Sequence, residues 1–356
     1  MIWGDNMENN LDIIKEEIKV KKKNKKTKIW VILFGIFDSI AIICLFLMYG
    51  PITYFRNLWV TSAMATMTHQ YLAYVFFDDD QIKIIMDNNI VIESEESTNT
   101  DDITVSGEDT GIYSSIYEEQ ILKRDEGNDI YKVIDIEGNG YKGHLLVVYD
   151  PSNIDLVQAP NIKYGGKQLK TLVELNDGLA GINASGFDYS EEFGYIPSGI
   201  VIMDGKVVWD SKLPKYGGII GFTRDNILVL TKSTSEEAIN MGIKDAVSFG
   251  PFLIVNGEPA QFKGNGGYGI APRTAIGQRK DGIVLMLVID GRRTGHSLGV
   301  DMVELTNILL RYGAYNASNL DGGGSSSIVA NGEILSVAGG FGYKGERYLP
   351  NAFIVK

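Results

Sequence analysis

The chain is poor in the residues that cross-link proteins or hold metals. Its 356 residues include one cysteine and three histidines, which excludes a disulfide framework and a cysteine-rich zinc module and leaves little for a histidine metal cage. Basic residues are also few, with 33 Lys and Arg against 45 Asp and Glu, the opposite of the balance typical of nucleic-acid-binding proteins. The length suits about two domains, and a 44% share of hydrophobic residues is enough to bury a core.

Positive charge is concentrated near the N-terminus, directly before the longest apolar run. Residues 15–28 hold eight lysines and two glutamates, and Asp38 is the one formal charge in residues 29–50. About 20 apolar residues let a helix cross a bilayer, and flanking lysines favour the cytoplasmic side. We therefore expect a cytoplasmic basic tail (1–28), a single transmembrane helix (29–50) in the cell membrane, and an extracytoplasmic main domain.

Alternatives to this topology depend on three features. A cleaved signal peptide is disfavoured, because the apolar run is longer than a signal core and no small-residue cleavage site follows it directly. Asp38 is costly in lipid, so it is either protonated or hydrogen-bonded to a neighbouring helix. Asn57–Phe77 has no formal charge, but its polar residues and the aspartates after it favour a juxtamembrane or interfacial helix (51–87) over a second span.

Cys44 lies in the span, so the outer domain has no disulfide, as in bacterial surface proteins.

The rest of the chain changes character twice. Residues 88–111 are acidic and polar and predict a linker. Residues 112–356 alternate short β-branched runs with turn residues, and they predict an α+β domain of mixed sheets with many short strands and few helices. Helices are expected over Ser235–Met241 and Val300–Tyr312, and hairpin turns at the Asp-Gly and Asn-Gly pairs that begin at Asp204, Asn256 and Asn331.

Four polar, glycine-bearing segments interrupt the apolar pattern and carry the candidate chemistry. In the last of them, Asp321 ends an apolar run and three glycines and three serines follow. Successive glycines let backbone amides converge on an anion, and a carboxylate beside them suits proton transfer, although a plain flexible turn has the same composition. The segments are NASGFD (183–188), APRTAIG (271–277), DGR (290–292) and NLDGGGSSS (319–327).

Arginines and further carboxylates accompany these segments. Arg273, Arg292 and Arg347 suit the recognition of phosphate oxygens, although each alone could be a surface residue. Paired carboxylates are the usual equipment for glycoside hydrolysis. His296 could be a general acid or a hydrogen-bonded structural residue, and a nucleophilic serine lacks its usual sequence context.

Taken together, these motifs resemble the phosphodiester glycosidase family. The resemblance implies a sugar joined through its anomeric carbon to a phosphodiester, of the N-acetylglucosamine-1-phosphodiester kind, and bacterial relatives with a membrane anchor are associated with exopolysaccharide biosynthesis. The matching segments are GINASGFD (181–188), IPSGIVIMDGK (196–206), SFGPFLIVNGE (248–258), APRTAIGQ (271–278), VIDGR (288–292), DMVELTNILLRYGAYNASNLDGGGSSSIV (301–329) and GERYLPNAFIV (345–355).

The expected activity is hydrolysis of a glycosyl-1-phosphodiester in surface glycan or teichoic-acid metabolism. A non-catalytic glycan-binding module and a membrane-anchored scaffold are the alternatives, and loop carboxylates could hold a structural Ca²⁺. The candidate catalytic residues are Asp321 as acid or base, with Glu304 or Asp290 as the partner carboxylate. The candidate substrate-binding residues are Arg273, Arg292, Gly322, Gly323 and Gly324 toward the phosphate, Asn183 and Asp188 toward sugar hydroxyls, and Ser325, His296 and Arg347 nearby.

Overall fold

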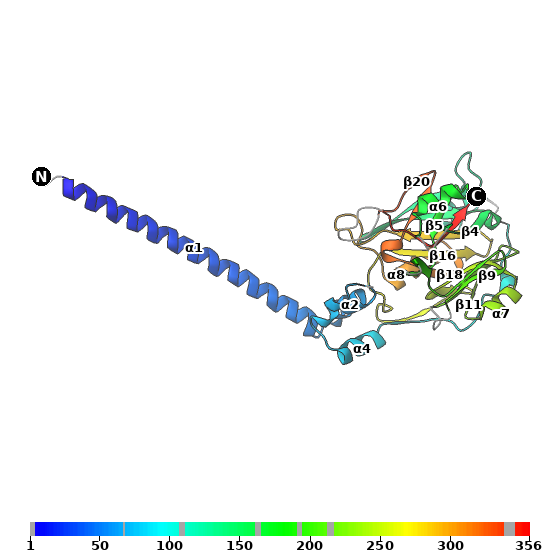
Figure 1. Ribbon diagram of the computed structural model, residues 1–356, viewed down its shortest axis with the longest axis horizontal. Helices are drawn as coiled ribbons and strands as arrows, with labels where there is room; N and C mark the ends of the chain where they lie inside the picture. Colours follow the sequence, from blue (N-terminus) through cyan, green and yellow to red (C-terminus); the bar gives the residue numbers. More distant parts are fainter. Residues whose placement is uncertain are drawn as a thin grey trace. The chain divides into compact units, whose positions relative to one another are not determined.

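The computed structural model describes residues 4–66, 68–106, 111–160, 165–190, 194–211, 217–337 and 346–356. The chain divides into two units, residues 1–56 and 57–356. The first unit is dominated by one helix and the second holds all the sheets (Figure 1).

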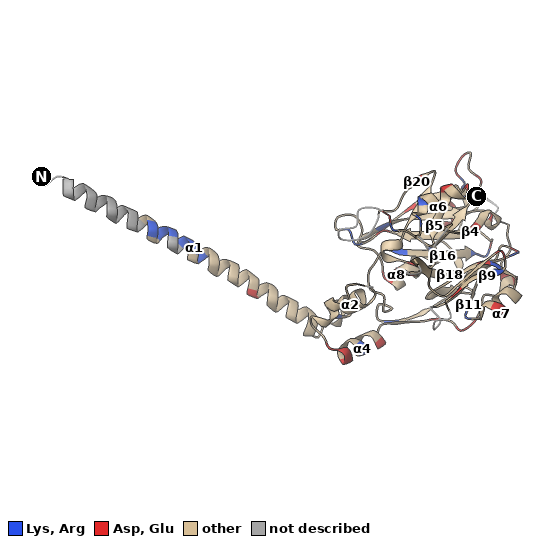
Figure 2. Cartoon of the chain, viewed as in Figure 1, with Lys and Arg blue, Asp and Glu red and all other residues tan. Residues whose placement is uncertain are grey.

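Helix α1 (Gly4–Tyr49) carries the apolar run expected from the sequence. Its part Ile18–Tyr49 contains an 18-residue stretch with a mean hydropathy of 2.7, is long and apolar enough to cross a membrane, and is the one such helix in the described residues. Figure 2 shows the lysines on the N-terminal side of this apolar stretch. One apolar N-terminal helix is therefore confirmed, while its membrane and its orientation stay predictions.

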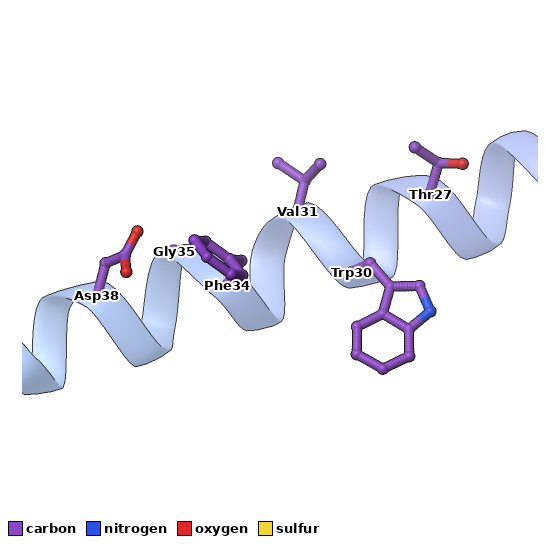
Figure 3. A pocket seen from close by; sticks show the side chains of 6 residues that line it. All are labelled: Thr27, Trp30, Val31, Phe34, Gly35 and Asp38. Carbon is purple, nitrogen blue, oxygen red and sulfur yellow. The ribbon is translucent and has the colours of Figure 1, made fainter.

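Asp38 shares one face of α1 with small and apolar side chains. Thr27, Val31 and Asp38 project to the same side in Figure 3, as the three- and four-residue helical spacings require. Six residues line a shallow hollow along this single helix: Thr27, Trp30, Val31, Phe34, Gly35 and Asp38.

The second unit is built around a seven-stranded antiparallel sheet in the order β14-β13-β18-β16-β17-β3-β2. Strand β16 (Arg273–Arg279) is near its centre, between β17 (Val284–Ile289) and β18 (Ala314–Leu320). The other strands are β2 (Tyr131–Gly138), β3 (Tyr141–Val148), β13 (Phe252–Val255) and β14 (Glu258–Pro259).

Two five-stranded sheets and two ribbons complete the sheet structure. The second sheet, in the order β20-β19-β5-β21-β4, contains β4 (Ile154–Gln158), β5 (Ala180–Asn183), β19 (Ile328–Ala330), β20 (Glu333–Ile334) and β21 (Asn351–Val355). The third, in the order β11-β10-β12-β8-β9, contains β8 (Ile200–Met203), β9 (Lys206–Asp210), β10 (Gly218–Thr223), β11 (Leu228–Thr231) and β12 (Ile243–Phe249). The ribbons pair β1 (Ile90–Ile92) with β15 (Gln261–Lys263) and β6 (Phe187–Ser190) with β7 (Gly194–Pro197).

The central sheet is buried on both faces. Leu146 and Val288 point into a core cluster shared with the other two large sheets, whereas their neighbours Leu145 and Leu287 point into a cluster beneath helix α8 (Met302–Arg311). This alternation follows from the two-residue period of a strand. The remaining elements of the domain are α5 (Ile116–Leu122), η2 (Pro151–Asn153), α6 (Leu169–Leu175), α7 (Ser235–Asn240) and η4 (Gly323–Ser325).

The α+β class predicted from the sequence is confirmed, together with both predicted helices. Helix α7 begins after the capping residue Thr234, and α8 begins after Asp301, whose side chain accepts the N–H of Glu304 at 2.9 Å. The predicted hairpin turns are confirmed as well. Their first residues, Asp204, Asn256 and Asn331, have φ of 50°, 55° and 54°, the left-handed conformation that Asx-Gly turns accept.

The described residues of 57–106 belong to the second unit. Within Asn57–Phe77 the described helices are the end of α2 (Thr53–Met64) and the short α3 (Tyr71–Tyr74), and neither is long enough to count as a candidate membrane span. Helix α4 (Asp79–Asp87) follows, with Asp78 as its capping residue.

The segment predicted as a linker, 88–111, is instead attached to the sheets as far as residue 106. Strand β1 pairs with β15, and η1 (Thr100–Asp102) follows it. The N–H of Thr98 bonds the carbonyl of Leu230 at 3.1 Å, and that of Thr104 bonds the carbonyl of Lys280 at 2.8 Å. Main-chain hydrogen bonds attach this segment, and they do not require apolar side chains. Its polar composition therefore indicated a spacer although the segment is bound to the sheets. Residues 107–110 lie outside the described ranges.

Candidate active site

Three of the polar segments meet at one edge of the central sheet. In the ladder, Arg273 at the start of β16 is opposite Ile289 at the end of β17, and Thr274 is opposite Leu320 at the end of β18. Asp290 and Asp321 are the next residues along their chains. Because β16 lies between them, their backbones are about two strand spacings, or about 10 Å, apart.

Asp321 is the most perturbed acid of this group. Burial raises its pKa from an ordinary value of 3.8 to about 6, although the hydroxyl of Ser325, the charge of Arg347 and the N–H of Gly322 oppose the rise. Its carboxyl is therefore close to half-protonated near pH 6. A group in that state can give or take a proton at the pH of most extracellular fluids.

Arg292 and Arg347 reach the turn that follows Asp321. A side chain on Gly323 would lie 3.5 Å from the guanidinium nitrogens of Arg292, whose pKa is lowered by desolvation. Arg347 donates to the hydroxyl of Ser325 at 3.4 Å and lies 4.7 Å above the ring of Phe187. Within the described ranges no salt bridge joins Arg292 or Arg347 to a carboxylate, although the charge of Arg347 acts on Asp321.

Arg273 is at the same edge but is buried. Its guanidinium donates to the carbonyls of Val300 at 3.1 Å, Tyr268 at 2.8 Å and Gly269 at 2.6 Å. Desolvation and the neighbouring Arg292 lower its pKa to about 10. Arg273 thus fixes the 268–269 loop and adds positive charge beneath the site, and its direct contact with phosphate stays a prediction.

Asp290 and His296 form a hydrogen-bonded pair. Asp290 is 3% exposed, and its carboxylate contacts Nε2 of His296 at 2.7 Å and accepts the N–H of Val337 at 2.9 Å. When Nε2 carries the proton toward Asp290, Nδ1 of the ring is the basic nitrogen. Asp290 therefore orients an imidazole whose side chain is 34% exposed.

Asn183 lies beneath the site instead of facing a ligand. It is fully buried and donates to the backbone carbonyl of Asp321 at 2.6 Å. Its Oδ1 accepts from the hydroxyl of Thr274 at 2.7 Å and from the N–H of Ser327 at 3.0 Å. The expected contact with sugar hydroxyls is therefore replaced by a positioning role that joins β5, β16 and the turn after β18.

The glycine turn does not form the three-amide anion nest that the sequence suggested. The N–H of Gly322 is directed to the Asp321 carboxylate and that of Gly323 bonds the carbonyl of Pro272 at 2.8 Å. Ser325 then closes the short helix η4 through a bond to the carbonyl of Gly322 at 3.1 Å. Of the three glycine amides, Gly324 alone has no such acceptor in the described part of the chain.

Two other predicted carboxylates form no hydrogen bond with Asp321 in the described residues. Glu304 accepts from the hydroxyl of Tyr141 at 2.7 Å and is paired with Arg311, which ties the first turn of α8 to β3. Asp188 is exposed on the β6–β7 ribbon, one residue beyond Phe187. The predicted pairing of Asp321 with Glu304 is therefore not formed, and Asp290 is the carboxylate that shares its sheet edge.

Sequence reasoning missed three residues that shape the site. Thr274 and Ser327 bond Asn183, and Phe187 supports Arg347. All three belong to the polar segments, so their position was the available signal, but their partners are distant in sequence. Among the described residues, no group of three or more His, Cys, Asp or Glu side chains could hold a metal ion, so the Ca²⁺ considered for loop carboxylates has no such group there.

These features define an α+β protein whose central sheet presents a desolvated acid, an oriented histidine and two arginines at one edge. Residues 173–356 match the phosphodiester glycosidase family, and the chain belongs to that family. The resemblance seen in the sequence is thereby confirmed.

Curated relatives and a solved structure agree with this assignment. The SPbeta prophage-derived uncharacterized protein YomE of Bacillus subtilis is 30% identical over 166 residues, 44% of this chain and 25% of that protein. The N-acetylglucosamine-1-phosphodiester alpha-N-acetylglucosaminidase of Bos taurus is 26% identical over 179 residues, 49% of this chain and 29% of that enzyme. The chain thus spans less than a third of either relative.

The solved catalytic domain of the zebrafish N-acetylglucosamine-1-phosphodiester alpha-N-acetylglucosaminidase, auto-inhibited by its pro-peptide, has the same fold. The TM-score is 0.53 at 20% identity, over 65% of this chain and 85% of that one.

Proposed function

We propose that this protein hydrolyses a glycosyl-1-phosphodiester, of the N-acetylglucosamine-1-phosphodiester kind, at the outer face of a bacterial cell membrane. The raised pKa of Asp321 beside Arg292 and Arg347, which have no salt bridge within the described residues, is the observation that carries the proposal. Membership of the phosphodiester glycosidase family supports the substrate class. Surface glycans and teichoic acids contain such linkages, and α1 supplies a candidate anchor.

The phosphodiester group would lie against Arg292 and Arg347. Its negative charge needs a positive partner both before and after the glycosidic bond breaks, and planar guanidinium groups bind phosphate oxygens in pairs. Buried Arg273 adds charge to this edge without leaving its three carbonyl partners. Because the arginines are held before substrate arrives, little reorganisation is needed as charge develops on the leaving phosphate.

Asp321 would act as the general acid. A bound phosphodiester anion disfavours the carboxylate further, so the proton that burial already retains stays on Asp321 in the complex. The proton then passes to the bridging oxygen as its bond to the anomeric carbon breaks. Asn183 contributes by holding the backbone of Asp321 in place.

His296 would activate the attacking water. Asp290 holds Nε2, which leaves Nδ1 to accept a proton from water, and the positive charge that forms on the ring is stabilised by the Asp290 carboxylate. The spacing of about 10 Å between the two backbones leaves room for a sugar ring and a water between the acid and the base. Asp290 is thus a positioning residue and His296 a catalytic one.

The test is turnover by the full-length chain in nanodiscs with a synthetic N-acetylglucosamine-1-phosphodiester. We expect free N-acetylglucosamine to be released, and His296→Gln to lower kcat by about 10²-fold and to change the shape of the pH–kcat profile. Asp225→Asn, in an exposed turn between β10 and β11, is the matched control and should retain wild-type kcat.

Two results would overturn the proposal in different ways. Saturable binding of the phosphodiester without release of sugar would indicate a non-catalytic glycan-binding module. Neither binding nor release would exclude this substrate class.

A further inference from the structure

Residues 57–76 present an exposed aromatic surface that the proposed chemistry does not use. We name it the aromatic face. It consists of Trp59, Tyr71, Tyr74 and Val75, which are 37%, 60%, 49% and 62% exposed.

The aromatic face is rigid because the opposite side of the same segment is built into the domain. Val60, Ala73 and Phe77 are buried. The hydroxyl of Thr61 accepts from the side chain of Asn265 at 2.9 Å. The exposed aromatic groups are thus held on a fixed part of the catalytic domain, residue 67 being outside the described ranges.

Internal contacts also fix the aromatic groups relative to one another. The indole N–H of Trp59 donates to the carbonyl of Leu72 at 2.9 Å, and its ring meets that of Phe76 edge to face at 5.9 Å. Tyr71 and Val75 are one helical turn apart and therefore share a face. These contacts hold Trp59 against the segment that carries Tyr71, Tyr74 and Val75, and the hydroxyl of Tyr74 bonds Asp79.

The position of this surface in the chain limits what can cover it. Three residues, 50–52, separate the end of α1 from the start of α2. With extended and helical rises per residue, Trp59 lies within about 25 Å of the end of the apolar helix in any arrangement of the two units. If α1 spans a bilayer, Trp59 is therefore within reach of its headgroup region.

We propose that the aromatic face docks in the headgroup region of the lipid bilayer that α1 spans. Tyr and Trp are the residues that favour this region, because each has an apolar body and a polar tip. No formal charge falls between Asn57 and Phe77, and Asp78 begins an acidic run. Docking therefore depends on aromatic burial and not on attraction to anionic lipids. The inference rests on the membrane placement given under the proposed function.

The experiment uses full-length protein in phosphatidylcholine nanodiscs, in a Cys44→Ser background with one engineered cysteine carrying an environment-sensitive fluorophore. Val75→Cys reports on the aromatic face, Val208→Cys on an exposed strand of the third sheet is the matched control, and Ile40→Cys reports on α1. We expect the Val75 label to be blue-shifted and quenched at least twofold when the acyl chains are brominated, and the Val208 label to be unaffected. Equal melting temperatures establish that the labelled proteins are folded.

Four outcomes would overturn docking. Quenching at Ile40 but not at Val75 means that the domain is held away from the bilayer, although the anchor is correct. No quenching at either means that α1 does not span, which also removes the membrane part of the proposed function. A blue shift at Val75 without quenching by brominated lipid indicates a protein partner. Quenching that appears only with added phosphatidylserine indicates electrostatic attraction.

Discussion

Asp321 and Glu304 are two carboxylates that have similar neighbours and differ in how their charge is compensated. Each lies near an arginine and a hydroxyl group, Asp321 with Arg347 and Ser325, Glu304 with Arg311 and Tyr141. The carboxylate of Glu304 is compensated by its ion pair. Asp321 is desolvated more than it is compensated, and its pKa rises to about 6.

The difference teaches that composition does not separate a structural acid from a reactive one. The carboxylate of Glu304 is held in a salt bridge at a partly exposed helix end. The carboxyl of Asp321 is desolvated, and its raised pKa makes it the better candidate for proton exchange.

The largest effect is expected for Asp321→Asn. Removing the general acid should lower kcat about 10³-fold while the fold is retained. Because the folded-state pKa of about 6 exceeds the ordinary 3.8, the native protein loses stability as pH rises from about 4 to 6. The variant should therefore be the more stable protein at pH 7.5, by at most about 3 kcal/mol, since Asp321 is partly exposed.

Thermal melts of both proteins at pH 4 and pH 7.5 check this sign. The advantage of the variant should shrink as the pH falls, because Asp321 is then protonated in the folded wild type and increasingly so in the unfolded chain. A variant that is less stable than wild type at pH 7.5, or that keeps full activity, would remove Asp321 from the mechanism.

Arg292 and Arg273 provide a second, smaller contrast, between an arginine expected to bind substrate and one expected to stabilise the fold. Arg292→Ala should lower kcat/KM about 10²-fold, because charge-assisted bonds to phosphate are lost, with little change in the free energy of unfolding. Arg273→Ala breaks three bonds to carbonyls and should reduce that free energy by about 3 kcal/mol. Urea titrations measure the free energy of unfolding of each variant, and kinetics measure its kcat/KM. If Arg273→Ala lowered kcat/KM and Arg292→Ala lowered the free energy of unfolding, Arg273 would be the phosphate ligand.

Glu304→Gln should have the smallest effect. Its pair with Arg311 is more than a third exposed on the arginine side, so its loss should cost about 1 kcal/mol or less. We expect kcat/KM to stay within about twofold of wild type, because the pair does not contact the site. A loss comparable with that of Asp321→Asn would restore Glu304 as the partner acid.

Much of the site could be predicted from the sequence, because glycines and polar residues mark the ends of buried strands. That pattern located Asp321, Asp290 and Arg292, and antiparallel pairing through β16 brings them to one edge. The partners of each side chain could not be predicted. Glu304 and Tyr141 are 163 residues apart, and nothing local distinguishes a glutamate that finds such a partner from one that faces substrate.

The fold followed the same division: its local features could be predicted from the sequence, and its long-range contacts could not. Turn residues and a helix cap gave the hairpins and α8 because these depend on a few neighbouring positions. The attachment of residues 88–106 depends on backbone bonds to β15, Leu230 and Lys280, which leave no mark in composition.

The contact of α2 with the 265–270 loop determines how the folded unit can be made as a recombinant fragment. The hydroxyl of Ser62 accepts the N–H of Ile270 at 3.3 Å, next to the carbonyl of Gly269 that holds Arg273. A truncated protein that starts at residue 112 would lack this hydrogen bond and would leave β15 without its partner β1. Crystallisation and assay trials should therefore begin from Asn57, where the compact unit begins.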